Sequence, residues 1–248
     1  MSNWLLNATF IAIVMLVILL IIKLYKESNK GTSKTVSEEK KAYVVNDDVF
    51  TKNRYNQILK SVKENDRVLN LGDNNDSLLT KALRAMNCSV TTVDYRVGAD
   101  IQLDMEGGLP LVGEFDTVIA GELFEHIYNL KELLRGVRLN LGRKGKLIVS
   151  VPNVCNLRSR VRVLIGLLPS YAADADTYHE VTGYPGHVRD FNKEAITRLL
   201  ESEGFEIITT RNTGLAFRMK PLIPYWLCRD EWSDNLIIEA KRKEADSK

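Results

Sequence analysis

The chain has 248 residues, enough for one α/β domain with attached segments, and its 45% hydrophobic and 27% charged residues are ordinary for a globular protein. A formal net charge of +2 gives no sign of the strongly basic surface that a dedicated nucleic-acid-binding protein carries. The three cysteines are far apart, so they form neither a disulfide framework nor a zinc-binding pattern, which fits a reducing compartment.

The first 27 residues have the pattern of a membrane anchor. The stretch from Trp4 to Leu24 is apolar and is interrupted only by Asn7, Thr9 and Lys23. As a helix it would be about 30 Å long, which matches the hydrocarbon core of a bilayer. A signal peptide would need a charged leader and a small-residue cleavage site, and neither is evident. Lysines follow the stretch and none precedes it, so we expect a single-pass membrane protein whose main domain faces the cytoplasm.

The segment after the anchor, residues 28–42, is polar and has no apolar period, which predicts a flexible tether. The main domain is predicted to cover residues 43–242, and residues 243–248 form a charged tail. This domain begins with a predicted helix between Val44 and Val62. Its apolar residues favour packing against the core of the domain, over a role in covering a bound ligand.

From Arg67 onward the sequence alternates short apolar runs with tight turns. Residues 68–71 predict a strand that ends at Gly72, and a helical apolar pattern follows at residues 78–83. A strand, a tight loop and a helix in this order are typical of the first unit of a doubly wound parallel sheet.

Three further strands are predicted in the same half of the chain. The second ends on Asp94, the third ends on Asp104, and the fourth contains residues 115–119. Only residues 95–100 separate the second strand from the third, which is too few for a crossover helix, so a compact loop is predicted there. In such sheets the ligand lies at the carboxyl ends of the strands, where these loops meet.

The second half of the chain continues the same alternation. The predicted elements are a helix at Leu130–Leu141 ended by Gly142 and Gly145, a strand at Leu147–Val151, a helix at Asp190–Glu203, and strands at Phe205–Thr210 and Leu236–Ala240. An insertion at residues 153–189 carries several arginines, which could hold an anionic acceptor, face anionic lipid or lie in solvent. The apolar stretch Met219–Cys228 is compatible with a pocket lip, a membrane-dipping loop or ordinary packing.

In their order and their residues, these segments resemble class I S-adenosylmethionine (SAM)-dependent methyltransferases, and in particular the ubiquinone-biosynthesis O-methyltransferases and MetW-like proteins. The resemblance covers about residues 65–240 and implies a Rossmann-like, doubly wound, seven-stranded α/β sheet with SAM as cosubstrate. It implies that Asp94, about 20 positions after Gly72, holds the ribose hydroxyls, and that Asp104 holds the adenine amino group. The residues expected to bind the cofactor are Asn70, Gly72, Asp73, Asn74, Asp76, Asp94, Tyr95, Asp104, Met105 and Gly121.

The glycine-rich loop departs from the family pattern of an acid, an aliphatic residue and then G-x-G-x-G. Asn70 replaces the acid, and Asn74 and Asp76 replace two of the glycines. Asn and Asp tolerate the left-handed region, so the turn can form, but the Asp76 carboxylate would intrude on the ligand. Either SAM binds with altered geometry, or the protein is an inactive, methyltransferase-like scaffold. A nicotinamide-dependent oxidoreductase is less compatible, because pyrophosphate needs the close approach that glycines allow.

Glu122, Glu125 and His126 follow the fourth strand, and on a helix they would share one face. They could stabilise a helix N-terminus, His126 could be a general base for an acceptor hydroxyl, or the group could bind a metal. The metal interpretation resembles the ubiquinone O-methyltransferases and the small-RNA 2′-O-methyltransferases. It implies a divalent cation (Mg or Zn) on Glu122, Glu125, His126 and His187, with His179 a weaker candidate. Glu125, His126 and His187 are accordingly the residues expected to take part in catalysis.

Together these features predict a membrane-anchored SAM-dependent methyltransferase. The expected reaction is O-methylation of a small-molecule, lipid-linked or glycan acceptor, and no nucleic-acid partner is expected. Because the sulfonium of SAM is already a good leaving group, the protein would mainly need to align acceptor and cofactor.

Overall fold

The computed structural model describes residues 49–169, 186–217 and 220–243. The predicted anchor, the tether, His179 and the tail beyond residue 243 lie outside these ranges. No helix within them is long and apolar enough to cross a membrane. The chain divides into two units at Tyr43–Val44, and all described residues belong to the second.

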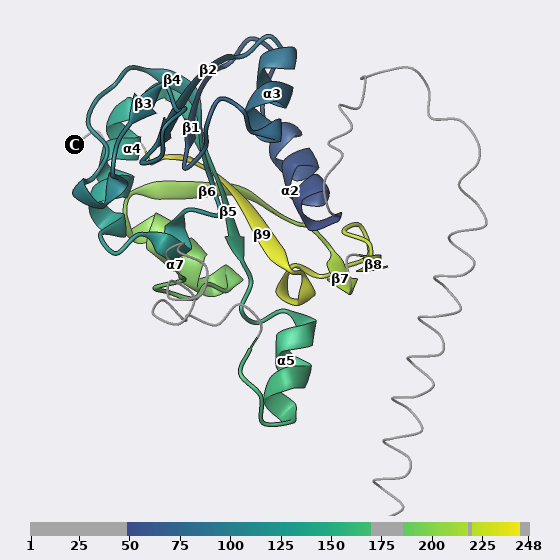
Figure 1. Cartoon of the computed structure of the whole chain (residues 1–248). Coiled ribbons are helices and arrows are strands. Elements are labelled where there is room, and N and C mark those ends of the chain that lie inside the picture. Colours follow the sequence, from purple (N-terminus) through teal and green to yellow (C-terminus); the bar gives the residue numbers. More distant parts are fainter. Residues whose placement is uncertain (1–48, 170–185, 218–219, 244–248) are drawn as a thin grey trace, which may run out of the picture. The chain divides into compact units, whose positions relative to one another are not determined.

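A seven-stranded sheet with the order β3-β2-β1-β4-β5-β9-β6 forms the centre of the domain (Figure 1). Its strands, in sheet order, are β3 (Ile101–Gln102), β2 (Ser89–Asp94), β1 (Arg67–Leu71), β4 (Phe115–Gly121), β5 (Leu141–Pro152), β9 (Asn235–Arg242) and β6 (Phe205–Asn212). The strands from β3 to β5 are parallel, whereas β9 runs antiparallel to both β5 and β6. The predicted doubly wound, Rossmann-like sheet of seven strands is thereby confirmed.

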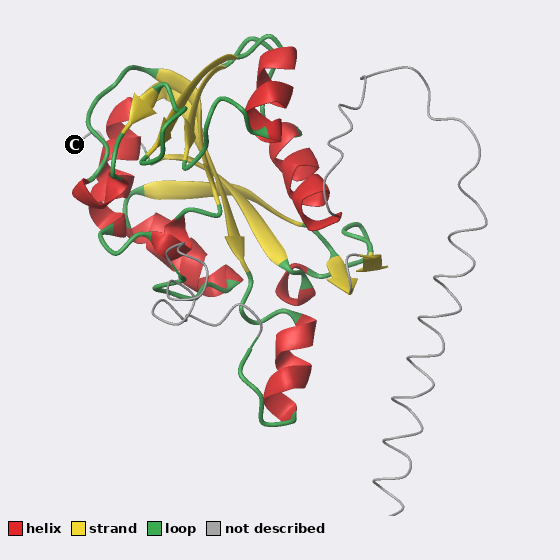
Figure 2. Ribbon diagram, viewed as in Figure 1, coloured by secondary structure: helices red, strands yellow, loops and turns green. Residues whose placement is uncertain are grey.

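Helices cover both faces of this sheet (Figure 2). One face packs against α4 (Leu130–Asn140) and α7 (Lys193–Ser202), and the other packs against α2 (Val49–Leu59) and α3 (Leu78–Ala85). The central strands are therefore apolar on both sides, as parallel strands between helices must be.

Strand β1 shows how one run of residues supplies both cores. Leu69 and Leu71 belong to the core on the α4 side, while Val68 belongs to the core on the α3 side. All three are at most 1% exposed. Burying each such side chain stabilises the fold by roughly 1.5–3 kcal/mol relative to leaving it exposed. The end of β1 that carries the loop is therefore firmly fixed.

Two predicted boundaries were wrong. The third strand ends at Gln102, because the Asp104 carboxylate accepts a hydrogen bond from the Glu106 N–H (3.0 Å) and caps a short 3₁₀ helix at Met105–Gly107. Gly142 and Gly145 lie inside β5 instead of ending a helix. A Cβ on Gly145 would lie 2.8 Å from the Phe115 carbonyl, so this strand pair needs a residue without a side chain there. The compact loop without a helix at residues 95–100 is confirmed.

The insertion after β5 contains helix α5 (Leu157–Leu164), which Asn156 caps by accepting a hydrogen bond from the Ser159 N–H (2.8 Å). The chain returns beside the start of this insertion, where Asn153 forms a β-bridge with Phe191. A hairpin of β7 (Leu215–Phe217) and β8 (Lys220–Ile223) was not predicted, because Pro221 and Pro224 argue against a strand in this part of the sequence.

Candidate active site

The carboxyl ends of β1, β2 and β4 meet at one edge of the sheet. The register pairs Leu71 with Val93 on one side and with Ala120 on the other, so the residues that follow these positions, Gly72, Asp94 and Gly121, are neighbours. The Gly72 N–H donates to the Val93 carbonyl at 2.8 Å.

Gly72 is the residue of this edge that must be glycine. Its φ is +72°, and a Cβ there would lie 3.1 Å from the Leu123 Cδ1 atom. The backbone conformation therefore strains any residue with a side chain, and the Leu123 side chain would have to shift to admit one. At Gly121 a Cβ would meet only the Ser150 Oγ at 3.7 Å, which is ordinary contact distance.

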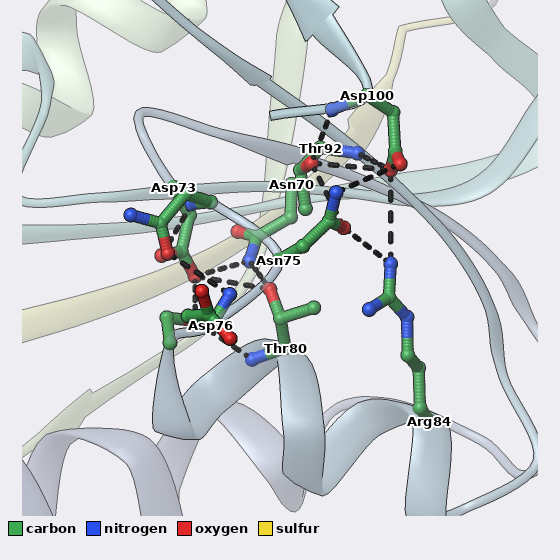
Figure 3. A network of polar contacts seen from close by, with 10 residues as sticks. Asn70, Asp73, Asn75, Asp76, Thr80, Arg84, Thr92 and Asp100 are labelled. Carbon is green, nitrogen blue, oxygen red and sulfur yellow. Dashed lines mark hydrogen bonds and ion pairs between the residues drawn. The ribbon is translucent and has the colours of Figure 1, made fainter. Parts of the chain in front are cut away.

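The loop after Gly72 is organised by the Asp73 carboxylate (Figure 3). It accepts hydrogen bonds from Asn70 Nδ2 (2.6 Å), Ser77 Oγ (2.6 Å), Thr80 Oγ1 (3.2 Å) and the Asn74 N–H (2.9 Å). Burial raises the pKa of Asp73, although these hydrogen bonds oppose the shift. A carboxylate thus lies directly against the Asn70 amide, where the family pattern has an acid at position 70 itself.

Asn74 and Asp76 do not adopt the left-handed conformation that was thought to make them suitable glycine replacements. Instead, the Asn74 side chain accepts a hydrogen bond from the Asp76 N–H at 3.1 Å, an Asx-type turn. The Asp76 side chain is 96% exposed and pairs with Lys81 at 3.6 Å. Its carboxylate consequently points into solvent and does not intrude on the loop as expected.

A second polar network ties this loop to the one after β2 (Figure 3). Asn75 Nδ2 donates to Asp100 Oδ1 (2.9 Å), and Arg84 forms an ion pair with Asp100 (3.7 Å). Asp100 also accepts from the Thr92 N–H (2.9 Å). These residues were not predicted from the sequence, where the signal for them is the pair of threonines between Val90 and Val93.

Asp94 is the last residue of β2 and is 1% exposed. Its carboxylate accepts from Arg96 Nη2 (2.8 Å), Arg96 Nε (3.0 Å) and the Arg96 N–H (2.8 Å). Burial would raise the pKa of Asp94, but the hydrogen bonds and charge of Arg96 hold it below its ordinary value. The acid expected to hold the ribose hydroxyls is thus engaged by an arginine of the chain itself.

The other expected cofactor residues lie around Asp94. Tyr95 is 50% exposed, whereas Met105 is 4% exposed and belongs to the core. The Leu103 N–H donates to the Asp94 carbonyl (2.9 Å), which holds the segment with Asp104 and Met105 beside β2. Asp104 is exposed and uses its carboxylate for the helix cap described above.

Glu122 does not share a helical face with Glu125 and His126, because its φ is +52° and the helix that follows is only a 3₁₀ turn at Phe124–His126. The carboxylate of Glu122 accepts from Ser150 Oγ (3.1 Å) and Asn235 Nδ2 (3.0 Å) and pairs with Arg54 Nη1 (3.3 Å). It thereby connects β4 with β5, β9 and α2.

Glu125 carries a buried carboxylate in the turn after β4. It is 1% exposed, and neither of its oxygens accepts a hydrogen bond from another residue that the structure describes. Burial raises the pKa of Glu125 well above its usual value, and repulsion from Glu122 adds to the shift. Because buried carboxylates otherwise find donors, this oxygen pair points to a ligand.

His126 and His187 complete this cluster. Their ring centroids are 5.0 Å apart at an interplanar angle of 68°, and ligand atoms of Glu125, His126 and His187 all lie within 4.8 Å of one another. The returning end of the insertion places His187, because the Val188 N–H donates to the Glu125 carbonyl (2.8 Å). The structure thus brings together three of the four expected metal ligands, and Glu122 is used elsewhere.

Comparison with solved structures supports the fold. A SAM-dependent methyltransferase from Thermotoga maritima, described as a possible histamine N-methyltransferase, is 15% identical with a TM-score of 0.57 over 77% of this chain and 88% of that one. A SAM-dependent methyltransferase from Mesorhizobium loti is 13% identical with a TM-score of 0.57, over 78% and 100%. The 1,6-didemethyltoxoflavin N1-methyltransferase of Burkholderia thailandensis, solved with S-adenosylhomocysteine, is 13% identical with a TM-score of 0.53, over 80% of each chain.

No curated protein sequence matches the chain. At identities this low the solved structures show a shared fold and nothing about the acceptor. The family that matches residues 47–210 is described as a methyltransferase domain, and this match covers most of the chain. The chain therefore belongs to this methyltransferase family, and it shares its fold with SAM-dependent methyltransferases.

Proposed function

We propose that the protein transfers the methyl group of SAM to an oxygen atom of an acceptor bound at Glu125, His126 and His187. The observation that carries this proposal is the carboxylate of Glu125, which is buried beside two imidazoles and accepts no hydrogen bond from the residues that the structure describes. Glu125 and His126 lie in the turn that follows β4, at the strand edge where SAM-dependent methyltransferases bind their cofactor.

A divalent cation fits these three side chains. Two imidazoles and one carboxylate are typical ligands of Zn²⁺ and related transition metals, whereas Mg²⁺ prefers oxygen ligands. When bound, such a cation would lower the pKa of an acceptor hydroxyl and fix its position. We therefore favour a zinc-like ion on Glu125, His126 and His187, with Glu122 outside the ligand set.

His126 has a defined orientation in this site. Its Nδ1 lies 3.1 Å from the Gly186 carbonyl, which can only accept a hydrogen bond, so Nδ1 carries the proton. Nε2 then carries the lone pair and is the atom that could bind a cation or accept the proton of an acceptor hydroxyl. Methyl transfer itself requires the acceptor oxygen in line with the sulfonium, and holding that oxygen is the main task of the cluster.

In our proposal, the membrane anchor keeps this reaction at the surface of a membrane. The apolar stretch Trp4–Leu24 would hold the domain at the cytoplasmic side of a membrane, where a lipid-linked or quinone-like acceptor is within reach. Extraction of the expressed protein from membranes by detergent but not by alkaline carbonate would support it. Recovery in the soluble fraction would contradict it.

The experiment that tests the proposed reaction uses full-length protein purified in detergent. It is titrated with S-adenosylhomocysteine and separately with Zn²⁺, and catechols are supplied as hydroxyl acceptors with and without a chelator. His126→Ala should abolish chelator-sensitive methylation while cofactor affinity stays within about twofold, whereas Glu132→Gln, on the exposed face of α4, should change neither. Folded protein that fails to bind S-adenosylhomocysteine would favour the inactive scaffold, and activity indifferent to the chelator would exclude the cation.

A further inference from the structure

The end of α5 carries an apolar surface that faces solvent. Six side chains, each between 48% and 84% exposed, form it: Val161, Val163, Leu164, Ile165, Leu167 and Leu168. They fall within eight consecutive residues, so exposed apolar side chains are concentrated in one short segment, unlike the scattered apolar residues of an ordinary surface. Figure 1 shows α5 extending from the carboxyl end of β5, away from the sheet.

The same helix is basic. Residues 154–169 contain Arg158, Arg160 and Arg162 and no Asp or Glu. Arg158 pairs with the buried Asp234 at 2.6 Å, which fixes α5 to the domain. Arg160 and Arg162 donate to backbone carbonyls, and neither forms an ion pair within the described part of the chain. Two positive charges that form no ion pair among the described residues therefore lie beside the apolar group.

We propose that α5 and the turn after it, residues 157–168, insert into the surface of an anionic lipid bilayer. Apolar side chains flanked by arginines match the acyl boundary and the anionic headgroups of such a surface. An apolar protein partner would bury the apolar side chains but would offer no negative charge to Arg160 and Arg162. The charge on the helix thus favours anionic lipid over the other possible occupants.

This docking would place the reaction site at the bilayer. Helix α5 begins just after β5 ends, and Asn153 connects this point to Phe191, which follows the segment that carries His187. Residues 28–43 can span at most about 55 Å between a bilayer and the domain. The inference deepens the proposed membrane setting and rests on it for the acceptor, but insertion of α5 requires neither methylation nor the cation.

The test uses full-length protein reconstituted into vesicles of phosphatidylcholine, with and without phosphatidylglycerol. An environment-sensitive fluorophore is attached at Leu164→Cys in a Cys155→Ser background, because Cys88 and Cys228 are buried. The matched control is Leu139→Cys on α4, where the native side chain is 60% exposed. Quenching by nitroxide-labelled lipid reports contact of each position with the bilayer.

We expect quenching at position 164 to exceed that at position 139 by about fivefold or more in the anionic vesicles. Arg160→Glu with Arg162→Glu should reduce it to the control level while S-adenosylhomocysteine affinity is unchanged, which separates this result from failure of the proposed function. Equal quenching at the two positions would overturn the inference. The inference would also be overturned if the fluorophore at position 164 is shielded from solvent to the same extent with and without anionic lipid, which would indicate that the chain itself covers it. Shielding that increases with the protein density in the vesicles would indicate a second copy and would overturn it as well.

Discussion

Arg96 forms hydrogen bonds with the Asp94 carboxylate, which is expected to bind the ribose of the cofactor. Its two guanidinium N–H groups reach the Asp94 oxygens at 2.8 and 3.0 Å. The ribose hydroxyls can use these oxygens only if Arg96 moves away or shares them. We therefore predict that Arg96→Ala strengthens the binding of S-adenosylhomocysteine.

The size of the effect follows from the exposure of the pair. Hydrogen bonds to a buried charged group contribute about 1.5–3 kcal/mol. The Arg96 side chain, however, is 44% exposed, and solvent reduces such ion pairs to below about 1 kcal/mol. Removing a competitor of about 0.5–1 kcal/mol should lower the Kd by a factor of about two to five.

Isothermal titration of both proteins with S-adenosylhomocysteine, at low and at high salt, measures this difference. Salt screens the Asp94–Arg96 pair, so the advantage of Arg96→Ala should shrink as the salt concentration rises. Arg135→Ala, an exposed arginine on α4, is the control and should leave the Kd unchanged. Weaker binding by Arg96→Ala would refute the reasoning, because it would mean that Arg96 contacts the cofactor and does not compete with it.

Three further changes test other parts of the site. Asp94→Asn should weaken S-adenosylhomocysteine binding by roughly 1–3 kcal/mol. The folded-state pKa of Asp94 is lowered, so the Asp94 carboxylate stabilises the protein at pH values above its unfolded pKa of about 3.9. This stabilisation is lost as the pH falls below that value. On such acidification the melting temperature of Asp94→Asn should therefore fall less than that of the native protein. Unchanged affinity would contradict the ribose assignment. Gly72→Ala should lower the free energy of unfolding by on the order of 1–3 kcal/mol in urea titrations, since φ is +72° and Leu123 is close; a neutral result would mean that the loop can relax. Glu125→Gln should abolish any Zn²⁺-dependent rise in melting temperature, and a rise equal to that of the native protein would exclude Glu125 as a ligand.

The sheet and its loops could be predicted because they follow from local patterns. The apolar runs of β1, β4 and β5 are buried on both faces, and each ends where a glycine or polar residue begins. The positions of Gly72 and Asp94 then follow from the topology, since parallel strands of one sheet end at the same edge.

Side-chain partners inside the loops could not be predicted in this way. Whether Asp94 meets solvent or Arg96 depends on the turn at residues 95–97, for which the sequence has no periodic signal. The contact between His126 and His187 joins residues far apart in the chain, and it was expected only from the family resemblance. The third strand was predicted to run to Asp104, but it ends at Gln102 because the Asp104 side chain accepts a hydrogen bond from a local backbone N–H group.

The irregular loop shows how one departure from the family pattern, Asn70, depends on its neighbour Asp73. Asn70 lacks the expected charge, yet Asp73 places a carboxylate 2.6 Å from its amide nitrogen. An aspartate at position 70, which is 1% exposed, would set two carboxylates against each other. We therefore predict that Asn70→Asp, although it restores the family residue, destabilises the protein by about 3 kcal/mol.

The deficit of Asn70→Asp should shrink as the pH falls, because the repelling pair then keeps a proton, and it should largely disappear when Asp73→Asn is added. Urea unfolding of both single variants and the double variant, at neutral and at mildly acidic pH, measures the coupling. A stable Asn70→Asp protein at neutral pH would show that the two positions are independent. A coupled pair would mean that the loop accommodates one carboxylate at positions 70 and 73 but not two.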